Sequence, residues 1–240
     1  MLIHQLPYHH DSSLLFERIA HQPWAMLLDS GQMLDANTGK PGSQYGRYDI
    51  MVAEPFITLV TTGENTEITQ HSHVSISAEN PFELLKSTLS QFPAPQTLFP
   101  SSGGTFPFSG GALGYFSYDL GRRLEKMPNL AQDDTPLPEM MIGIYDWAIV
   151  VDHREKTSHL VSNGFCESTK ANWDSLCVRF ESFNQVKMHE NPFLVTSSVQ
   201  SNLPESAYKR AFAKIKAYIT AGDCYQVNLA QRFSAEVQGD

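Results

Sequence analysis

The sequence predicts an α+β fold with a largely antiparallel sheet. The expected strands outnumber the expected helices, and they follow one another in hairpin-like runs instead of alternating with helices, as a parallel sheet would require. No segment recurs at a period of about 20 to 50 residues, which argues against a solenoid or a propeller. Of the 240 residues 41% are hydrophobic, so the chain can bury a large core.

The N-terminal part of the chain begins with a helix and two strands. Residues 11–22 (DSSLLFERIAHQ) combine capping side chains with apolar residues at helical spacing, and Pro23 ends this helix. Residues 24–30 (WAMLLDS) form a short buried strand, and residues 47–62 (RYDIMVAEPFITLVTT) form a longer one. Pro55 within the longer strand indicates a bulge or an edge position, because proline donates no ladder hydrogen bond.

The middle of the chain predicts a capped helix, a loop and several strands. Asn80 is a good N-cap and Pro81 suits the first helical position, so residues 80–92 form a helix. Turn-forming residues dominate 93–109, which is therefore a loop or a flexible lid. Three strands in a meander are expected after it, at 110–120, 142–152 and 157–163.

Two further helices are predicted toward the C-terminus. The first covers residues 167–183 and places Trp173, Leu176, Cys177 and Phe180 on one face. A strand or connector at 191–199 follows it. The second helix covers residues 206–222 and ends at Gly222 in a left-handed conformation.

The segment after Gly222 alternates as a strand does. Its apolar side chains are Tyr225, Val227, Leu229 and Phe233, and between them stand Gln226, Asn228 and Arg232. One face of this closing strand would be apolar, while the other would present amides and a guanidinium. A sheet that lines a polar pocket has this pattern, and so does a sheet with one face in solvent.

Charge and composition exclude several functions. The net charge is −9 and the basic residues are scattered, which disfavours nucleic acid as a partner. No apolar run approaches the roughly 20 residues of a membrane span, and the first residues lack the pattern of a secretory signal, so we expect a cytoplasmic protein. The three cysteines, Cys166, Cys177 and Cys224, show no metal-binding spacing and are expected to be reduced.

No catalytic group can be named from the residues alone. The glycine-rich run 110–121 lacks the GK[ST] of a phosphate-binding loop and leads into a strand, which favours close backbone packing over nucleotide binding. His71 and His73 stand close together without a nearby carboxylate and are expected to be solvated.

Four stretches nevertheless resemble one family, in the family's order. KAYITAGDCYQVNLAQRF (216–233) resembles the central motif of the chorismate-utilising enzymes, the family of anthranilate synthase component I. Within that family the likeness is greatest to the component I subunits of aminodeoxychorismate synthases, also called para-aminobenzoate synthases. The other three stretches are PWAMLLDSG (23–31), QYGRYDIMVAEP (44–55), and FSGGALGYFSYDLGRRLEKMP (108–128) with LPEMMIGIYDWAIVVDH (137–153).

The resemblance implies an activity and a fold. Chorismate and ammonia would become 4-amino-4-deoxychorismate in a transaminase-type step toward folate, with ammonia from a glutaminase subunit and with Mg²⁺ holding the substrate. The family's fold packs two antiparallel sheets face to face with helices outside. Its metal ligands and catalytic residues lie in the second half of the polypeptide, so this chain would be an N-terminal half without catalytic or metal-binding residues, and inactive alone. Residues 1–200 would form the scaffold and docking region, and 201–240 the start of the catalytic region.

The resemblance also implies a tryptophan pocket. Ser30 would bond the amino or carboxylate group of the ligand, while Tyr45, Arg47 and Tyr48 would supply a polar and aromatic wall. Asp29 departs from the LLES pattern of anthranilate synthases, which leaves feedback inhibition open. Alternatively, Ser30 caps a turn and Arg47 pairs with a nearby carboxylate.

Two other functions stay open at this point. The first is anthranilate synthase component I, which also works with a glutaminase. The second is a tryptophan-binding or docking module without catalysis.

Overall fold

The computed structural model describes residues 1–31, 45–93, 105–126, 128, 136–181 and 192–239. The chain forms two compact units, Met1–Val186 and Lys187–Asp240. Most of the predicted loop 93–109 lies outside the described residues. No helix in the described ranges is both long and apolar enough to cross a membrane.

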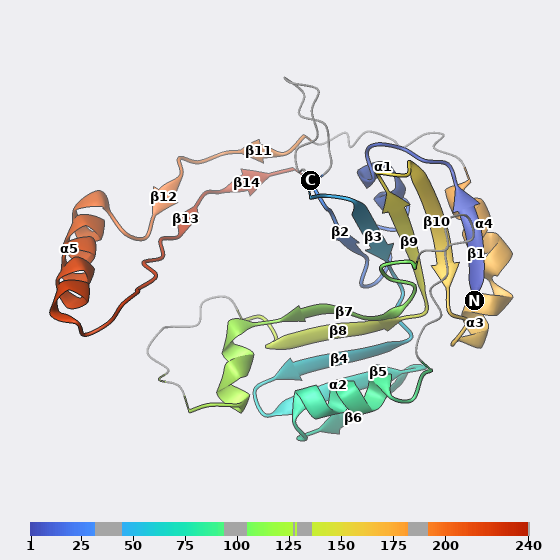
Figure 1. The fold of residues 1–240 in the computed structure, drawn as a ribbon, viewed down its shortest axis with the longest axis horizontal. Coiled ribbons are helices and arrows are strands. Elements are labelled where there is room, and N and C mark those ends of the chain that lie inside the picture. Colours follow the sequence, from blue (N-terminus) through green and yellow to red (C-terminus); the bar gives the residue numbers. More distant parts are fainter. Residues whose placement is uncertain (32–44, 94–104, 127, 129–135, 182–191, 240) are drawn as a thin grey trace. The chain divides into compact units, whose positions relative to one another are not determined.

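The first unit contains two five-stranded antiparallel sheets (Figure 1). The first sheet has the order β1 (Leu2–Leu6), β10 (Thr157–Ser162), β9 (Trp147–Asp152), β3 (Tyr48–Val52) and β2 (Met26–Leu28). The second sheet has the order β6 (His73–Ser77), β5 (Asn65–Gln70), β4 (Ile57–Thr62), β8 (Met140–Tyr145) and β7 (Gly111–Phe116). All strand pairs are antiparallel, as the sequence predicts.

Two long runs of chain cross from one sheet to the other. The predicted strand 47–62 is two strands, β3 and β4, which are interrupted by Glu54 in a left-handed conformation (φ 55°) and by Pro55. The predicted strand 142–152 likewise divides into β8 and β9 at Asp146. The expected meander is therefore wrong, because β8 pairs with β7 in one sheet while β9 pairs with β10 in the other.

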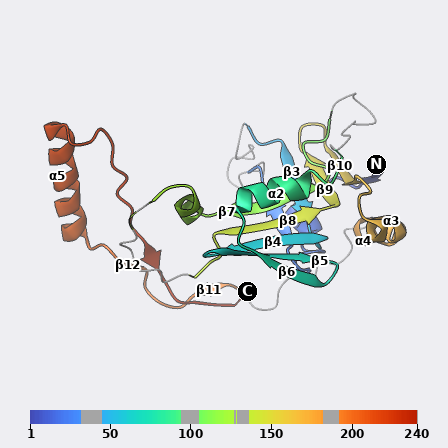
Figure 2. The same cartoon turned by 90° about the horizontal axis from the view of Figure 1, so that it is seen from below.

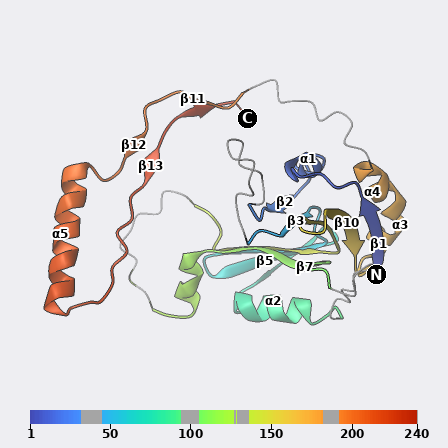
Figure 3. The same ribbon diagram turned by 45° about the horizontal axis from the view of Figure 1, so that its top comes forward.

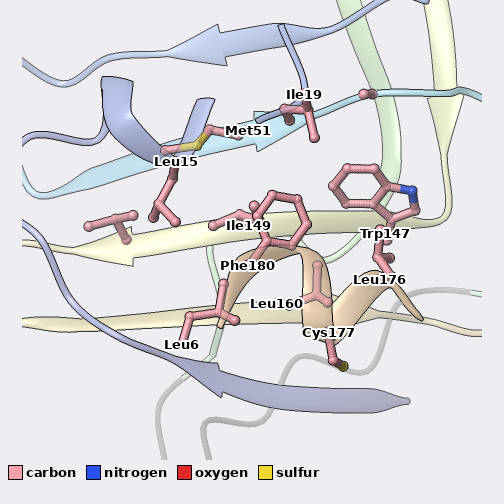
Figure 4. Packing of buried hydrophobic residues seen from close by; sticks show 12 residues of the cluster. Leu6, Leu15, Ile19, Met51, Trp147, Ile149, Leu160, Leu176, Cys177 and Phe180 are labelled. Atoms are coloured by element: carbon pink, nitrogen blue, oxygen red, sulfur yellow. The ribbon is translucent and has the colours of Figure 1, made fainter. Parts of the chain in front are cut away.

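One face of the first sheet is covered by short helices, α1 (Ser13–Phe16) and α4 (Trp173–Phe180). Figure 4 shows the resulting core, in which Phe180 lies among side chains from the strands and from α1. The predicted apolar face of residues 173–180 is confirmed, because all four of its side chains pack in this core. The predicted helices are longer than those observed: 11–22 is helical only over α1, and 167–183 is broken at Asn172 into α3 (Glu167–Ala171) and α4.

The second sheet buries one face against α2 (Pro81–Leu89), as Figure 2 shows. The predicted cap is confirmed, because Asn80 Oδ1 accepts the Phe82 N–H at 2.9 Å. Leu84 of α2 packs with the buried side chains of β4 and β8. The strand predicted at 110–120 ends with β7, and a 3₁₀ helix, η1 (Tyr118–Arg123), follows it.

The second unit consists of α5 (Glu205–Ala221) and two short ladders, and Figure 3 shows the long helix at one end of them. The ladders pair β11 (Leu194–Val195) with β14 (Val237–Gln238) and β12 (Gln200–Ser201) with β13 (Phe233–Ser234). The predicted helix end is confirmed, since Gly222 is left-handed with φ 84°.

The predicted closing strand after Gly222 is wrong over most of its length. Residues 223–232 have no regular structure, and the Tyr225 side chain is 94% exposed. A strand needs a ladder partner for its backbone groups. In the described residues after Gly222 only β13 and β14 have such partners, which are β12 and β11.

Candidate ligand site at the edge of the first sheet

Ser30 follows β2 and is held by the neighbouring strand β3. Its backbone N–H and its hydroxyl both donate to Asp49 Oδ1, at 2.8 and 2.7 Å. Asp29 instead turns back on its own loop, where its carboxylate accepts the Gly31 N–H at 2.7 Å. The Ser30 hydroxyl is therefore oriented by a carboxylate that comes from the strand beside it.

Asp49 lies at the centre of a buried polar network. Its second oxygen, Oδ2, is 2.7 Å from Nε2 of His153, and the two side chains are only 5% and 6% exposed. On the other side of the imidazole, Nδ1 and the Tyr8 hydroxyl share a hydrogen bond of 3.2 Å. Burial alone would raise the Asp49 pKa, but the hydrogen bonds from its neighbours, including His153 and Ser30, outweigh burial and lower it. Asp49 is thus a stable carboxylate acceptor.

Arg47 forms a two-pronged ion pair with Asp152 of β9. Arg47 Nη2 is 2.8 Å from Asp152 Oδ2, and Nε donates to both carboxylate oxygens at 3.1 and 3.2 Å. The Asp152 side chain is almost completely buried, whereas that of Arg47 is 38% exposed. Hydrogen bonds from Arg47 and from backbone amides overcome the effect of burial and lower the Asp152 pKa. The guanidinium also lies 4.6 Å from the centre of the Tyr48 ring.

Of the alternative contacts considered from the sequence, the pairing of Arg47 with a carboxylate is present, whereas Ser30 bonds Asp49 of the neighbouring strand instead of capping a turn. These contacts leave both Ser30 and Arg47 able to form further hydrogen bonds. The bonds to Asp152 use Nε and Nη2 of Arg47 and leave its side chain partly in solvent. The Ser30 hydroxyl donates a hydrogen bond to Asp49, and its oxygen lone pairs can still accept hydrogen bonds.

This polarity determines what the site could bind. Since the Ser30 proton is engaged by Asp49, its oxygen would accept a hydrogen bond from a ligand amine and would not donate one to a ligand carboxylate. A ligand carboxylate would find its donor in the guanidinium of Arg47, two residues before Asp49 on the chain. The arrangement therefore suits a ligand that carries an amine and a carboxylate.

The other candidate residues are exposed or belong to the second unit. Tyr45 is 87% exposed. Gln226, Asn228 and Arg232 lie in the second unit, in the segment that is not a strand, so the strict alternation that assigned them to one face is absent. Gln226 Nε2 donates to Asn228 Oδ1 at 3.4 Å, and the Arg232 backbone N–H donates to Asn202. That they face a pocket stays a prediction.

The acidic and imidazole members of the network, Asp49, His153 and Asp152, were not predicted as site residues from the sequence. A signal for them was present, because an aspartate in the middle of the apolar run YDIMV, and an aspartate at the end of WAIVVD, must find partners if those strands are buried. In the described residues no three His, Cys, Asp or Glu side chains gather where they could hold a metal ion.

The model of a protein family described as chorismate binding enzymes matches residues 41–240. Aminodeoxychorismate synthase component 1 of Escherichia coli K12 is 39% identical over 225 residues, which are 94% of this chain and 45% of that protein. The corresponding protein of Salmonella typhimurium LT2 is 37% identical over 98% of this chain and 47% of its own length. Anthranilate synthase component 1 of Acetivibrio thermocellus is 28% identical over 92% of this chain and 45% of its own length.

A solved structure shares the fold. The crystal structure of anthranilate synthase component I from Streptococcus pneumoniae TIGR4 matches with a TM-score of 0.60 at 20% identity, over 82% of this chain and 44% of that one. The expected α+β class, with antiparallel sheets as in anthranilate synthase component I, is confirmed by this match. This chain spans about half the length of the curated relatives described here. By the family match over most of its residues, the chain belongs to the chorismate binding enzymes.

Proposed function

We propose that this chain is the N-terminal part of component I of an aminodeoxychorismate synthase. The whole protein would convert chorismate and ammonia to 4-amino-4-deoxychorismate, a transaminase-type step that leads to para-aminobenzoate and folate. The observation that carries the proposal is the difference in similarity. Identity is 37–39% over 94–98% of this chain for the aminodeoxychorismate synthase relatives, against 28–30% over 84–92% for the anthranilate synthase relatives.

Product identity tests this proposal. The full-length protein would be incubated with chorismate, Mg²⁺ and an ammonium salt, and the products separated by liquid chromatography with mass and fluorescence detection. We expect 4-amino-4-deoxychorismate. Anthranilate as the product would support the rival enzyme, and the absence of any amination would support the non-catalytic module.

The ammonia source and the active part of the protein form a second level of the proposal. A glutaminase subunit would supply ammonia, and Mg²⁺ would be bound outside the residues described here. Turnover with glutamine should then require the glutaminase, whereas turnover with ammonium salts should not. Residues 1–240 alone should aminate no chorismate with either nitrogen source, and measurable turnover by them would contradict this assignment.

We also propose that the Ser30 network forms one wall of a tryptophan site, together with Tyr45, Arg47 and Tyr48. The Ser30 oxygen would accept from the ligand ammonium, and Arg47 would pair with the ligand carboxylate. What supports the proposal is that Asp49 holds the Ser30 hydroxyl in the orientation that presents its lone pairs.

Retention of tryptophan by the full-length protein tests this site. After extensive dialysis, Arg47→Ala and Ser30→Ala should each retain less tryptophan than the parent protein. Arg210→Ala, which removes an exposed arginine of α5, is the matched control and should retain as much as the parent. Indole-3-propionate, which lacks the ammonium, should bind more weakly than tryptophan, and equal binding of the two would contradict the role of Ser30.

A further inference from the structure

A pocket of the first unit lies apart from the Ser30 network and shares no residue with it. It is an open pocket of about 300 Å³, lined by residues of α3 and α4 and by Trp147 and Glu54. Figure 4 shows Leu176 of α4 next to the indole of Trp147, and these two side chains form its apolar floor. The other lining residues are polar or charged: Glu54, Ser168, Thr169, Asn172, Ser175 and Arg179.

Glu54 and Arg179 form an ion pair in this pocket that is not a hydrogen bond. Glu54 Oε2 and Arg179 Nη1 are 3.7 Å apart, which is beyond hydrogen-bond distance, and their side chains are 45% and 36% exposed. Arg179 Nη1 is itself buried, and no hydrogen-bond acceptor lies within reach of it among the described residues. A buried guanidinium nitrogen without an acceptor is unfavourable, and a ligand in the pocket would meet the part of the Arg179 side chain that remains exposed.

The backbone places Glu54 in the pocket at a cost. Glu54 has φ 55°, a left-handed conformation that is unfavourable for a residue with a long side chain. Its N–H donates to the Pro23 carbonyl at 3.0 Å, which fixes the bend between β3 and β4. Asparagine or glycine would adopt this conformation more easily, so the bend alone does not explain a glutamate.

We infer that this pocket binds a free α-amino acid with a small polar side chain. The ligand carboxylate would accept from Arg179, and its ammonium would donate to Glu54, so that each charge of this long ion pair gains a hydrogen-bonded partner. Both protein charges are needed for this assignment: Glu54 repels a simple anion, and Arg179 repels a simple cation. The hydroxyls of Ser168 and Ser175, with Thr169 and Asn172, would surround a polar side chain.

Blocked amino acids test the inference directly. L-Glutamine and L-serine would be titrated into the full-length protein, without a glutaminase subunit and without chorismate, by isothermal titration calorimetry. We expect a Kd on the order of 1 mM for at least one of them, as is reasonable for a small ligand in an open site. N-Acetyl-L-glutamine and L-glutamine amide each lack one charge and should bind at least about tenfold more weakly, since each loses a charge-assisted hydrogen bond.

Two variants separate binding from folding. Glu54→Asn removes the carboxylate but suits a left-handed backbone, so it should keep the thermal midpoint of the parent while it weakens amino-acid binding at least about tenfold. Arg179→Gln should weaken binding to a similar degree. Glu79→Gln and Arg210→Gln remove exposed charges elsewhere and are the matched controls.

Ser30→Ala should leave this binding unchanged, which distinguishes the pocket from the proposed tryptophan site. Equal affinity for free and blocked glutamine, unchanged affinity in both pocket variants, or no binding of either free amino acid would overturn the inference. None of these outcomes depends on the product formed from chorismate, so the proposed function is tested separately.

Discussion

Replacing Asp49 by alanine should loosen the strands around it, because this carboxylate accepts hydrogen bonds from two neighbouring segments. It bonds the backbone and hydroxyl of Ser30 at 2.8 and 2.7 Å and contacts His153 at 2.7 Å. Hydrogen bonds to a charged group contribute about 1.5–3 kcal/mol each, so three would contribute about 4.5–9 kcal/mol together. Asp49→Ala also removes the cost of burying a carboxylate that is only 5% exposed, and this offsets part of the lost hydrogen bonding. The net loss in the free energy of unfolding is therefore about 3–5 kcal/mol, the usual cost of breaking a buried pair.

Hydrogen–deuterium exchange of the full-length protein, read by mass spectrometry, measures this loss locally. A loss of about 3 kcal/mol corresponds to an exchange rate on the order of 100-fold faster in peptides from β2, β3 and β9, where exchange follows local opening. Peptides from β5 and β6 in the second sheet serve as the internal reference. Asp119→Ala, which removes an exposed carboxylate paired with Arg122, should change protection by less than about 0.5 kcal/mol and is the control.

Asp49 and His153 should also be energetically coupled, because they share one contact. His153→Ala should be destabilising, and the double variant should lose clearly less than the sum of the single losses, because both remove the same contact. Additive losses, or a change below about 0.5 kcal/mol in Asp49→Ala, would show that the network does not hold these strands together.

Three further predictions concern acid, a close backbone approach and the core. The fold lowers the pKa of Asp49 and of Asp152. Their contribution to stability is therefore present above the unfolded pKa of about 3.9 and is lost as the pH falls through the folded pKa values. We expect β3 to lose exchange protection in that acid range. Protection that stays constant down to pH 2 would contradict this. Gly114→Ala should strongly lower the thermal midpoint of unfolding, since its methyl group would overlap the Met141 carbonyl of β8. A midpoint within 1 °C of the parent's, which corresponds to a stability change of ~0.3 kcal/mol, would refute the close approach. Phe180→Ala should cost about 3–5 kcal/mol in urea unfolding followed by tryptophan fluorescence, since its side chain is fully buried, and a loss below about 1 kcal/mol would mean that the core refills the space.

Local sequence signals predicted individual elements well where the controlling contacts are local. The Asn80 cap and the Gly222 helix end each depend on atoms within a few residues, and both are confirmed. The apolar face from Trp173 to Phe180 also follows from helical spacing alone. Helix lengths were overestimated, because the same capping and apolar signals do not report where backbone hydrogen bonds tighten or break, as they do at Asn172.

The candidate site was predicted only in part. The motif resemblance pointed to Ser30 and Arg47, but not to the residues that orient them. Asp49 and His153 are 104 positions apart, and only the pairing of β3 with β9 brings them together. No local pattern marks such a pair, since each residue alone reads as a polar interruption of a strand.

By itself the sequence determined the α+β class, the family motifs, and the helix caps and ends that depend on neighbouring residues. The tertiary structure decided which strands share a sheet, since one run of alternating residues can serve two sheets when its backbone bends at Glu54 or Asp146. It also decided that residues 223–232 form no strand, because a strand is stable only where a partner accepts its backbone hydrogen bonds. The state of the Asp49 carboxylate was likewise decided by the tertiary structure, since its hydrogen bonds and its desolvation depend on residues that are distant along the chain.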